Sequence, residues 1–303
     1  MTNPSPASTS SPVSVCVVAP AKINLVLRIL DRRPDGYHNL WSLMQTVTVE
    51  DEITIRLSSS HSLITLRCDD PSLEADASNL VYRAAVAVME QSGRGGGVDI
   101  TLAKRIPMGA GLGGGSSDAA ATIIGLNRLF NLGWSAEKMA HIGQMLGSDV
   151  PFFFFAPSAS VAGRGEHVAP VRIKGTRWVV LVNPGFPVET KWAYQELAAT
   201  RTGVVPLSHA HARLEQAAEL GWEQVLEVAE NDFEGPVFKT YPLLEEIKHR
   251  LLAHGAEAAL LSGSGATVFG LFHDEIQARQ AQTVFLNEPQ FRVFVAQTSS
   301  LSS

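Results

Sequence analysis

Hydrophobic residues recur along the chain with two spacings, one typical of helices and one typical of strands. Leu80, Ala84 and Val88 follow the helical spacing and predict a helix over residues 79–92, whereas residues 98–103 alternate as a strand does. The other strands expected in the first half are 13–18, 21–29, 42–50, 52–57, 62–68, 152–155 and 160–162, and the other helices are 116–130 and 135–146.

Single residues set several expected boundaries between these elements. Pro20 separates the first two strands, because proline lacks the N–H that a central strand position donates. Ser135 is the expected N-cap of the helix over 135–146, and Gly147 is its expected C-terminal stop. The turn at residues 163–165 contains two glycines and predicts a hairpin.

The second half of the chain predicts a different arrangement of elements. Its expected strands are 178–182, 258–261, 267–272 and 291–297, and its expected helices include 241–254 and 275–285. The order of strand, turn, strand, helix and strand at the end is typical of an antiparallel sheet with helices on one face. The fold class predicted for the whole chain is therefore α+β.

The length of 303 residues favours two domains over a single core. We expect an N-terminal domain over 13–170 and a C-terminal domain over 171–300. Residues 1–12 are uncharged and rich in Ser, Thr and Pro, so they are expected to form a disordered tail, and they lack the pattern of a secretory signal. The most apolar stretch, residues 150–156, is far shorter than the roughly 20 residues of a membrane helix.

Charge and cysteine content exclude several classes of protein. The net charge of −6 argues against a nucleic-acid partner. Cys16 and Cys68 are far apart and form no CxxC pair, so neither a disulfide framework nor a zinc site is expected. These features favour a reducing, cytoplasmic compartment and no nucleic-acid partner. We further expect a small-molecule substrate, no membrane partner, and a monomer or a weak homodimer.

Residues 107–117 read Pro-Met-Gly-Ala-Gly-Leu-Gly-Gly-Gly-Ser-Ser, with five glycines in seven positions. Glycine lacks Cβ, so this backbone can adopt positive φ and approach a ligand closely. A helix is expected directly afterwards, and the free N–H groups of its first turn form an anion site. Ser116 and Ser117 can add hydroxyl donors or hold a metal ion on the phosphates. The segment therefore predicts a phosphate-binding loop.

Three alternatives to this interpretation can be compared. A flexible linker fits less well, because the loop stands directly between a strand and an Ala-rich helix. A Walker loop is excluded, because the segment contains no Gly-Lys-Ser/Thr. Gly109, Gly111 and Gly114 do match the GxGxxG pattern of dinucleotide-binding folds, but such a unit needs a second parallel strand after the helix. A second helix is expected there instead.

Lys22 and Asp149 are the candidate charged pair for phosphoryl transfer. Lys22 alternates with apolar neighbours, and a surface lysine on an edge strand is the commoner explanation of that pattern. Asp149 follows a predicted helix and precedes the apolar residues 152–155, so it is either a cap or a site carboxylate. A carboxylate can take the proton of an acceptor hydroxyl, and a nearby lysine would keep it ionised. The residues alone leave these alternatives open.

Three segments resemble the motifs of the galactokinase, homoserine kinase, mevalonate kinase and phosphomevalonate kinase superfamily. They are residues 20–25 (Pro-Ala-Lys-Ile-Asn-Leu), residues 107–120 with the glycine-rich loop, and residues 261–269 (Leu-Ser-Gly-Ser-Gly-Ala-Thr-Val-Phe). Within it the chain is similar to the 4-diphosphocytidyl-2-C-methyl-D-erythritol kinases, through residues 33–40, 146–153 and 230–234. The resemblance implies a two-domain galactokinase/mevalonate kinase-type fold, with an N-terminal ATP-binding α/β domain and a C-terminal substrate-side domain. It also implies ATP-dependent phosphorylation of the 2-hydroxyl of the diphosphocytidyl substrate, in the non-mevalonate route to isoprenoid precursors.

The resemblance also implies roles for particular residues. Lys22 and Asp149 would be the catalytic pair, with Asp149 as base and Lys22 orienting it and stabilising charge. Tyr37 would stack on the cytosine and His38 would hydrogen-bond to it. The residues that it places around ATP are Asn79, Lys104, Pro107, Met108, Gly109, Ala110, Gly111, Leu112, Gly113, Gly114, Gly115, Ser116 and Ser117.

Other residues follow from the same resemblance on the substrate side. Asn24 and Thr190 would contact the substrate. Gly263 and Gly265 suit either a hairpin turn or a backbone beside the active site, and the resemblance favours the second. Mg²⁺ would be held mainly by ATP phosphates and water, with Ser117 as its candidate protein ligand. His209 and His211 are expected to be solvated, and residues 152–155 are expected to belong to the core.

Overall fold

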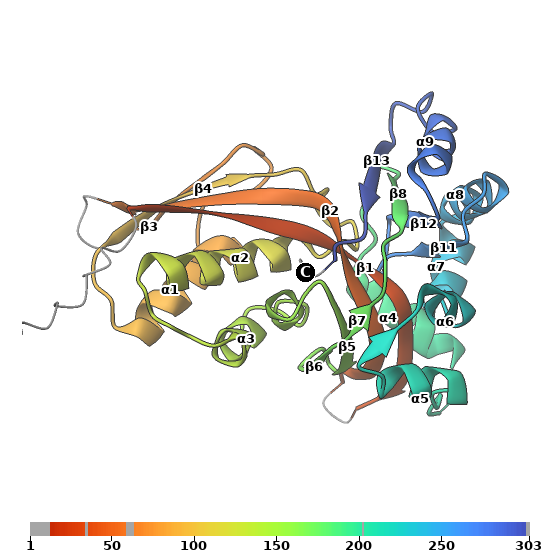
Figure 1. Ribbon diagram of the computed structural model, residues 1–303, viewed down its shortest axis with the longest axis horizontal. Helices are drawn as coiled ribbons and strands as arrows, with labels where there is room; N and C mark the ends of the chain where they lie inside the picture. The colour runs from red at the N-terminus through yellow and green to blue at the C-terminus, as the bar shows by residue number, and fades with distance from the viewer. Residues whose placement is uncertain (1–12, 34–35, 59–63, 202, 301–303) are drawn as a thin grey trace, which may run out of the picture.

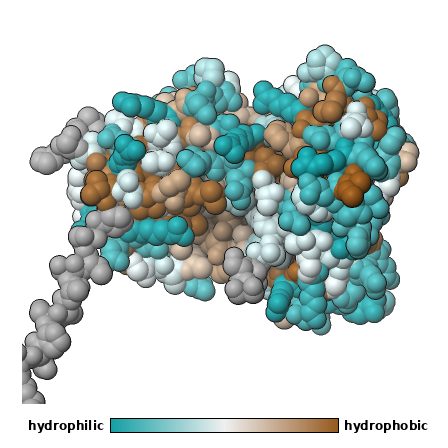
Figure 2. Space-filling view, turned by 45° about the horizontal axis from the view of Figure 1, so that its top comes forward, coloured by the Kyte–Doolittle hydropathy of each residue, from teal (hydrophilic) through white to brown (hydrophobic). Residues whose placement is uncertain are grey.

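The computed structural model describes residues 13–33, 36–58, 64–201 and 203–300, so the predicted tail over 1–12 lies outside the described residues. Two lobes are visible, one built around a long twisted sheet and the other around a short antiparallel sheet (Figure 1). Figure 2 shows the same two lobes side by side as a space-filling surface.

The long sheet contains seven strands, ordered β10-β1-β2-β4-β3, with β5 paired to β2 and β6 paired to β5. They are β1 (Ser14–Arg32), β2 (His38–Ser58), β3 (Ile64–Cys68), β4 (Gly97–Ala103), β5 (Ser158–Gly163), β6 (His167–Pro170) and β10 (Glu230–Asn231). β10 lies beyond the predicted domain boundary at residue 171 yet pairs in parallel with β1. The boundary stays a prediction.

β1 and β2 are each one continuous strand, so the sequence-based prediction of two shorter strands in each place was wrong. A register shift between Pro20 and Ala21 absorbs the proline, so the pairing of β1 with β2 continues past it. Asp51 interrupts the apolar pattern of β2 but is fully buried within the strand. Its carboxylate accepts hydrogen bonds from the main-chain amides of Arg105 and Ile106, which compensates for its burial.

Three helices lie on one side of the long sheet, two of them packed on its strands and the third packed on the other two (Figure 1). They are α1 (Leu80–Ser92), α2 (Gly114–Leu129) and α3 (Ala136–Gln144). Asn79 caps α1 by accepting from the Val81 amide, and Ser135 caps α3 by accepting from the Lys138 amide, as predicted for Ser135. α3 ends at Gln144, before Gly147, so the predicted stop at that glycine was wrong.

The predicted strand over 152–155 is instead a 3₁₀ helix, η1 (Pro151–Phe154). Pro151 occupies its first turn, where the missing N–H is not needed and the fixed φ suits a helix. The Phe153 amide donates to the Val150 carbonyl, and Phe155 donates to Phe152. A short apolar run has no period of its own, so its composition could not distinguish a strand from a helix. Of the residues 152–155 predicted to belong to the core, Phe152 and Phe153 are buried, whereas Phe154 and Phe155 are only half-buried.

The second lobe contains an antiparallel sheet in the order β11-β12-β8-β13. These strands are β8 (Trp178–Asn183), β11 (Ala258–Leu261), β12 (Val268–Phe272) and β13 (Arg292–Gln297). Helices α8 (Pro242–Ala253) and α9 (Glu275–Thr283) pack against this sheet, which confirms the predicted antiparallel arrangement. The remaining elements are α4 (Thr190–Thr200), α5 (His209–Glu215), α6 (Trp222–Glu227), α7 (Glu234–Thr240), β7 (Arg172–Ile173) and β9 (Glu219–Leu220).

The two sheets share part of one hydrophobic core. Ile23 and Trp41 of the long sheet belong to the same buried cluster as Leu181 and Phe269 of the short sheet. This shared core holds the loops at the ends of the two sheets next to each other. Within the residues described, no helix has the length and apolar character needed to cross a bilayer.

His211 corrects one sequence-based expectation. We expected it to be solvated, but it is buried, because α5 folds back so that its imidazole contacts Trp41. Its Nδ1 lies 2.8 Å from Ser208 Oγ and its Nε2 lies 2.9 Å from Glu230 Oε1. His209, at the start of the same helix, is exposed as expected.

Candidate active site

The glycine-rich loop runs from β4 to α2 and borders a cavity of about 380 Å³. Residues 107–116 all line this cavity, together with Asn79 and Lys104. Gly109, Gly111 and Gly113 all have positive φ, which favours glycine at these positions. Gly113 is the N-cap of α2, so the open amides of the first helical turn face the loop side. The arrangement is that of an anion site at a helix N-terminus.

Two other segments approach the loop so closely that side chains would not fit there. A Cβ on Gly111 would lie 2.0 Å from the Ser262 carbonyl oxygen, and a Cβ on Gly113 would lie 2.9 Å from Lys22 Cγ. The Lys22 amide donates to the Leu112 carbonyl at 2.9 Å, and Ser262 Oγ donates to the Gly111 carbonyl at 2.9 Å. The loop is therefore fixed on one side by β1 and on the other by the turn before β12.

Beneath the loop lies a buried charged cluster formed by Lys104, Asp51 and Asp118. The Lys104 ammonium contacts both carboxylates, at 2.8 Å in the case of Asp118 Oδ2. Burial raises the pKa of Asp118 to about 7; the charge of Asp51 acts in the same direction and Lys104 opposes it. Burial alone would lower the pKa of the Lys104 ammonium. The two carboxylates outweigh this effect, so its pKa is raised. Asp51 accepts from the amides just before the loop, and Asp118 lies in the helix just after it. Lys104 therefore links the two ends of the loop through these carboxylates.

Ser117, the candidate metal ligand, is almost completely buried in the first turn of α2. Neither its Oγ nor Asp118 Oδ1 has a hydrogen-bond partner among the described residues. A hydroxyl and a carboxylate are hard oxygen donors of the kind that Mg²⁺ takes, so these two residues fit such an ion. The described part of the chain contains no group of three or more His, Cys, Asp or Glu side chains that could hold a metal alone.

Lys22 and Asp149 lie together beside this loop. Lys22 Nζ is 3.4 Å from Asp149 Oδ2, with side chains 4% and 34% exposed respectively. The alternative of a surface lysine is therefore excluded. Lys22 Nζ also donates a hydrogen bond to Asn24 Oδ1 at 2.7 Å, so its ammonium has one hydrogen-bond acceptor and one ion-pair partner. One basic and one acidic group thus lie next to each other beside the loop.

Asn24 is engaged within the protein at every polar side-chain atom. Its Oδ1 accepts from Lys22 and from the Gly263 amide at 3.0 Å, and its Nδ2 donates to Ser42 Oγ at 2.9 Å. A direct contact with substrate stays a prediction for this residue. What the structure adds is that Asn24 orients the Lys22 ammonium.

Asn231 extends this hydrogen-bond chain, and the residue patterns assigned it no role. Its Nδ2 donates to the carbonyls of Leu261 and Gly263 at 2.7 and 2.8 Å, and its Oδ1 accepts from Phe233. It thereby fixes the Gly263 amide that donates to Asn24. The one signal in the sequence was the place of this residue in the segment 230–234, through which the chain resembles the diphosphocytidyl kinases.

We expect Asn231→Ala to reduce both stability and turnover. Two buried carbonyls would lose their donor, which lowers the free energy of unfolding by about 2–4 kcal/mol. Displacement of Gly263 and Asn24 would misplace Lys22 and lower kcat about 10-fold. Thermal unfolding and initial rates measure the two effects.

Asn127→Ala is the matched control for this variant. Asn127 makes the same kind of amide contacts, with the Trp134 main chain, in the last turns of α2 far from the loop. It should lose stability and keep its kcat. Equal losses of kcat in the two variants would show that Asn231 has no specific role in positioning Lys22.

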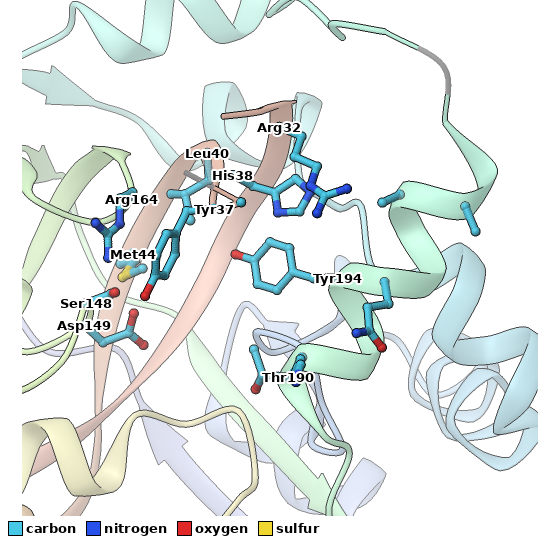
Figure 3. Close-up of a pocket in the computed structure, with 16 residues that line it drawn as sticks. Arg32, Tyr37, His38, Leu40, Met44, Ser148, Asp149, Arg164, Thr190 and Tyr194 are labelled. Carbon is cyan, nitrogen blue, oxygen red and sulfur yellow. The ribbon is translucent and has the colours of Figure 1, made fainter. Parts of the chain in front are cut away.

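A larger cavity of about 840 Å³ opens on the other side of Asp149. Tyr37, His38, Thr190 and Tyr194 line it together with Asp149 (Figure 3). The predicted substrate residues Tyr37, His38 and Thr190 are thus brought together, from β2 and its preceding turn and from α4. Gly263 and Gly265 lie against the glycine-rich loop and Val188 instead and do not line this cavity.

Aromatic rings form one end of this cavity. The His38 and Tyr194 rings stack at 4.9 Å between centroids. Burial, with the positive charge of Arg32, lowers the pKa of His38, so its imidazole is neutral near pH 7 and can both donate and accept. Burial and the charge of Asp149 raise the pKa of Tyr194. The sequence did not identify Tyr194 as a cavity residue, because a tyrosine in an amphipathic helix is usually explained by core packing.

Thr190 marks the place where the cavity meets the turn before β12. Its Oγ1 lies 2.9 Å from Ser264 Oγ. Because Ser262 and Gly263 of the same turn contact Gly111 and Asn24, this turn links the two cavities. Asp149 and Lys22 therefore lie between the glycine-rich loop and a large aromatic cavity.

Comparisons with known proteins match both halves of the chain. Residues 79–156 match the model of the GHMP kinases N terminal domain, and residues 201–289 match that of the GHMP kinases C terminal domain. A protein of Geobacter sp. (strain M21), named 4-diphosphocytidyl-2-C-methyl-D-erythritol kinase, is 44% identical over 88% of this chain and 92% of its own. A protein of the same name from Geobacter metallireducens is 42% identical over 92% of this chain and 97% of its own.

Solved structures agree with these matches. A crystal structure of 4-(cytidine 5'-diphospho)-2C-methyl-D-erythritol kinase superposes with a TM-score of 0.76 at 33% identity, covering 94% of this chain and all of that one. Homoserine kinase from Cytophaga hutchinsonii superposes with a TM-score of 0.73 at 20% identity over 97% of each chain, which shows the shared fold. The expected α+β, two-domain kinase-type fold is thereby confirmed.

Proposed function

Since this chain belongs to the 4-diphosphocytidyl-2-C-methyl-D-erythritol kinases of the GHMP kinase family, we propose that it transfers a phosphoryl group from ATP to the 2-hydroxyl of 4-diphosphocytidyl-2-C-methyl-D-erythritol. The product would serve isoprenoid precursor biosynthesis. The observation that carries the proposal is the position of Asp149, which lines the aromatic cavity while its carboxylate pairs with Lys22 beside the glycine-rich loop.

The phosphate donor is assigned to the smaller cavity. The open amides at the start of α2 and the bare backbone of residues 109–115 would hold the phosphates of ATP. Asn79 and Lys104 line the same cavity and would lie beside the bound nucleotide. Ser117 and Asp118 would hold Mg²⁺, which would neutralise charge on the phosphate oxygens when bound.

The acceptor is assigned to the larger cavity. Tyr37 offers a ring for stacking on cytosine, and the neutral His38 offers a donor and an acceptor for its edge. With the base at that end, the polyol end of the substrate reaches Asp149 and Thr190 at the turn that links the cavities. The reacting hydroxyl then faces the phosphate loop.

The chemical step follows from these positions. The 2-hydroxyl oxygen attacks the γ-phosphorus, the bond from that phosphorus to the bridging oxygen of ADP breaks, and Asp149 accepts the hydroxyl proton. Lys22, held by Asn24 and by the Leu112 carbonyl, keeps Asp149 oriented and stabilises the charge that develops on the transferring group.

An ATP-coupled assay tests this function directly. The protein would be given 4-diphosphocytidyl-2-C-methyl-D-erythritol, homoserine and mevalonate in parallel. We expect turnover with the first alone, because the other two carry no nucleobase for the aromatic cavity. Turnover with homoserine or mevalonate, and none with the cytidyl compound, would overturn the proposal.

Tyr37→Ala is expected to separate binding from chemistry. Loss of one base-stacking partner should raise the KM for the cytidyl substrate about 5- to 100-fold. It should change kcat less than about 3-fold, because stacking holds substrate and transition state alike. The KM for ATP, which binds in the other cavity, is the internal control. An unchanged KM for the cytidyl substrate would exclude Tyr37 from the base site.

A further inference from the structure

The turn between β5 and β6 reaches into the larger cavity, and the proposed mechanism gives it no role. It consists of Gly163, Arg164, Gly165 and Glu166. Both glycines have positive φ, at 72° and 116°. The Glu166 carboxylate folds back over the turn and accepts from the Arg164 amide. The turn is therefore held in one shape by its own side chain.

The same turn packs against the chain beside the proposed base. A Cβ on Gly165 would lie 2.6 Å from the Ser148 carbonyl oxygen and 3.2 Å from Ser148 Cβ. Ser148 immediately precedes Asp149. The hairpin turn thus packs against the main chain next to Asp149. Arg164, in the same turn, lines the cavity.

The guanidinium of Arg164 lies over the ring of Tyr37. Its guanidinium carbon is 3.6 Å from the ring centroid, and both residues line the cavity. In Figure 3 the Tyr37 ring lies between Arg164 and Tyr194, so the guanidinium covers one side of the ring and the other side is turned to the cavity. Arg164 Nε is buried and has no hydrogen-bond partner in the described part of the chain. The contact that the structure gives for this guanidinium is the one with the Tyr37 ring.

Tyr37 needs such a support because it is itself 54% exposed. A half-exposed tyrosine loses side-chain freedom when it binds a ligand, and that loss weakens binding. A planar guanidinium stacked on one face restricts the ring before the ligand arrives, and arginine does this better than lysine. Arg164 also blocks that face for a nucleobase, so a base can stack only on the side towards Tyr194.

We propose that Arg164 is a positioning residue that holds the Tyr37 ring ready for a pyrimidine nucleoside and thereby sets specificity for the nucleobase end of the acceptor. The proposal rests on the proposed function of this cavity. Arg164 acts through Tyr37 and takes no part in phosphoryl transfer. Its loss should raise the KM for the cytidyl substrate about 3- to 30-fold. It should leave kcat and the KM for ATP within about 2-fold.

A double-mutant cycle on ligand binding tests the coupling of the two residues. Binding of CDP and of cytidine would be measured by calorimetry for the unsubstituted protein, Arg164→Ala, Tyr37→Ala and the double variant. Arg164→Ala should weaken both ligands about equally in the unsubstituted background and less than about 2-fold in the Tyr37→Ala background. Arg164→Lys should recover part of the loss, because it restores charge but not the flat stack.

Three results would overturn the role of Arg164. Additive losses in the cycle, or a loss for CDP but not for cytidine, would mean that Arg164 contacts the ligand itself. Unchanged affinity in Arg164→Ala would mean that the stack has no effect. Arg172→Ala, which removes a side chain 68% exposed at the surface, controls for loss of charge alone. Melting temperatures show that each variant is folded.

The outcome is separable from that of the proposed function. Absence of phosphoryl transfer by the unsubstituted protein overturns the function, whereas additive binding losses overturn the positioning role alone.

Discussion

Asp149→Asn is expected to lower kcat by about 10²- to 10⁴-fold, the range that a positioned general base contributes. Asparagine keeps the size of the side chain but cannot accept the proton of the attacking hydroxyl. It also removes the negative charge that pairs with Lys22 at 3.4 Å. Steady-state kinetics with ATP and the cytidyl substrate measures the loss.

The affinity for ATP distinguishes loss of the general base from a structural disruption of the whole active site. The glycine-rich loop is anchored through the Lys22 main chain, so ATP binding in Asp149→Asn should stay within about 3-fold of the unsubstituted protein. Ser148→Ala, at the neighbouring position, should be nearly as active as the unsubstituted protein. A kcat within 3-fold of normal in Asp149→Asn would show that another group takes the proton.

Gly111→Ala should have the largest effect on the architecture of the site. The new Cβ would lie 2.0 Å from the Ser262 carbonyl oxygen, and φ is +75° at this residue. A main-chain oxygen cannot rotate away as a side chain can, so the loop and the turn before β12 must separate. Strain and overpacking together should lower the free energy of unfolding by about 2–5 kcal/mol. ATP affinity should fall about 10-fold or more, because the amides of the loop move with it.

Chemical denaturation and nucleotide titration measure these two losses. Gly115→Ala is the control for stability, because its Cβ would meet nothing closer than 3.5 Å and its φ is not positive. That variant should unfold within about 1 kcal/mol of the parent, since alanine is favoured in a helix. A Gly111→Ala protein with normal stability and normal ATP affinity would mean that the loop does not depend on this contact.

The glycine-rich loop illustrates what could be predicted from sequence. Its five glycines, the strand before it and the helix after it are local features, and the structure has both elements next to the loop. Local residue types also predicted the cap at Ser135 and most strands of the second lobe. They failed at residues 152–155, where four apolar residues carry no period and Pro151 begins a 3₁₀ helix.

Residues that act through distant partners could not be recognised in the same way. From its sequence position Arg164 is an ordinary turn residue. The pairing of β5 with β2 places it over the ring of Tyr37. Asn231 reads as a polar loop residue until β10 pairs with β1 and turns its amide to Gly263. His211 reads as solvated until α5 folds back towards Trp41.

By itself, the sequence determined the chemistry available to this protein: a bare backbone at a helix N-terminus, one lysine and one aspartate in recognisable motifs, and an aromatic residue beside a histidine. Only the tertiary structure decided that Lys22, Asp149 and the loop meet between two cavities, and that Arg164 and Asn231 support them. The physical reason is that φ preferences and hydrophobic periods depend on neighbours in the chain. The hydrogen bonds that join the glycine-rich loop and Asn24 to the turn before β12 depend instead on residues brought together from more than a hundred positions away.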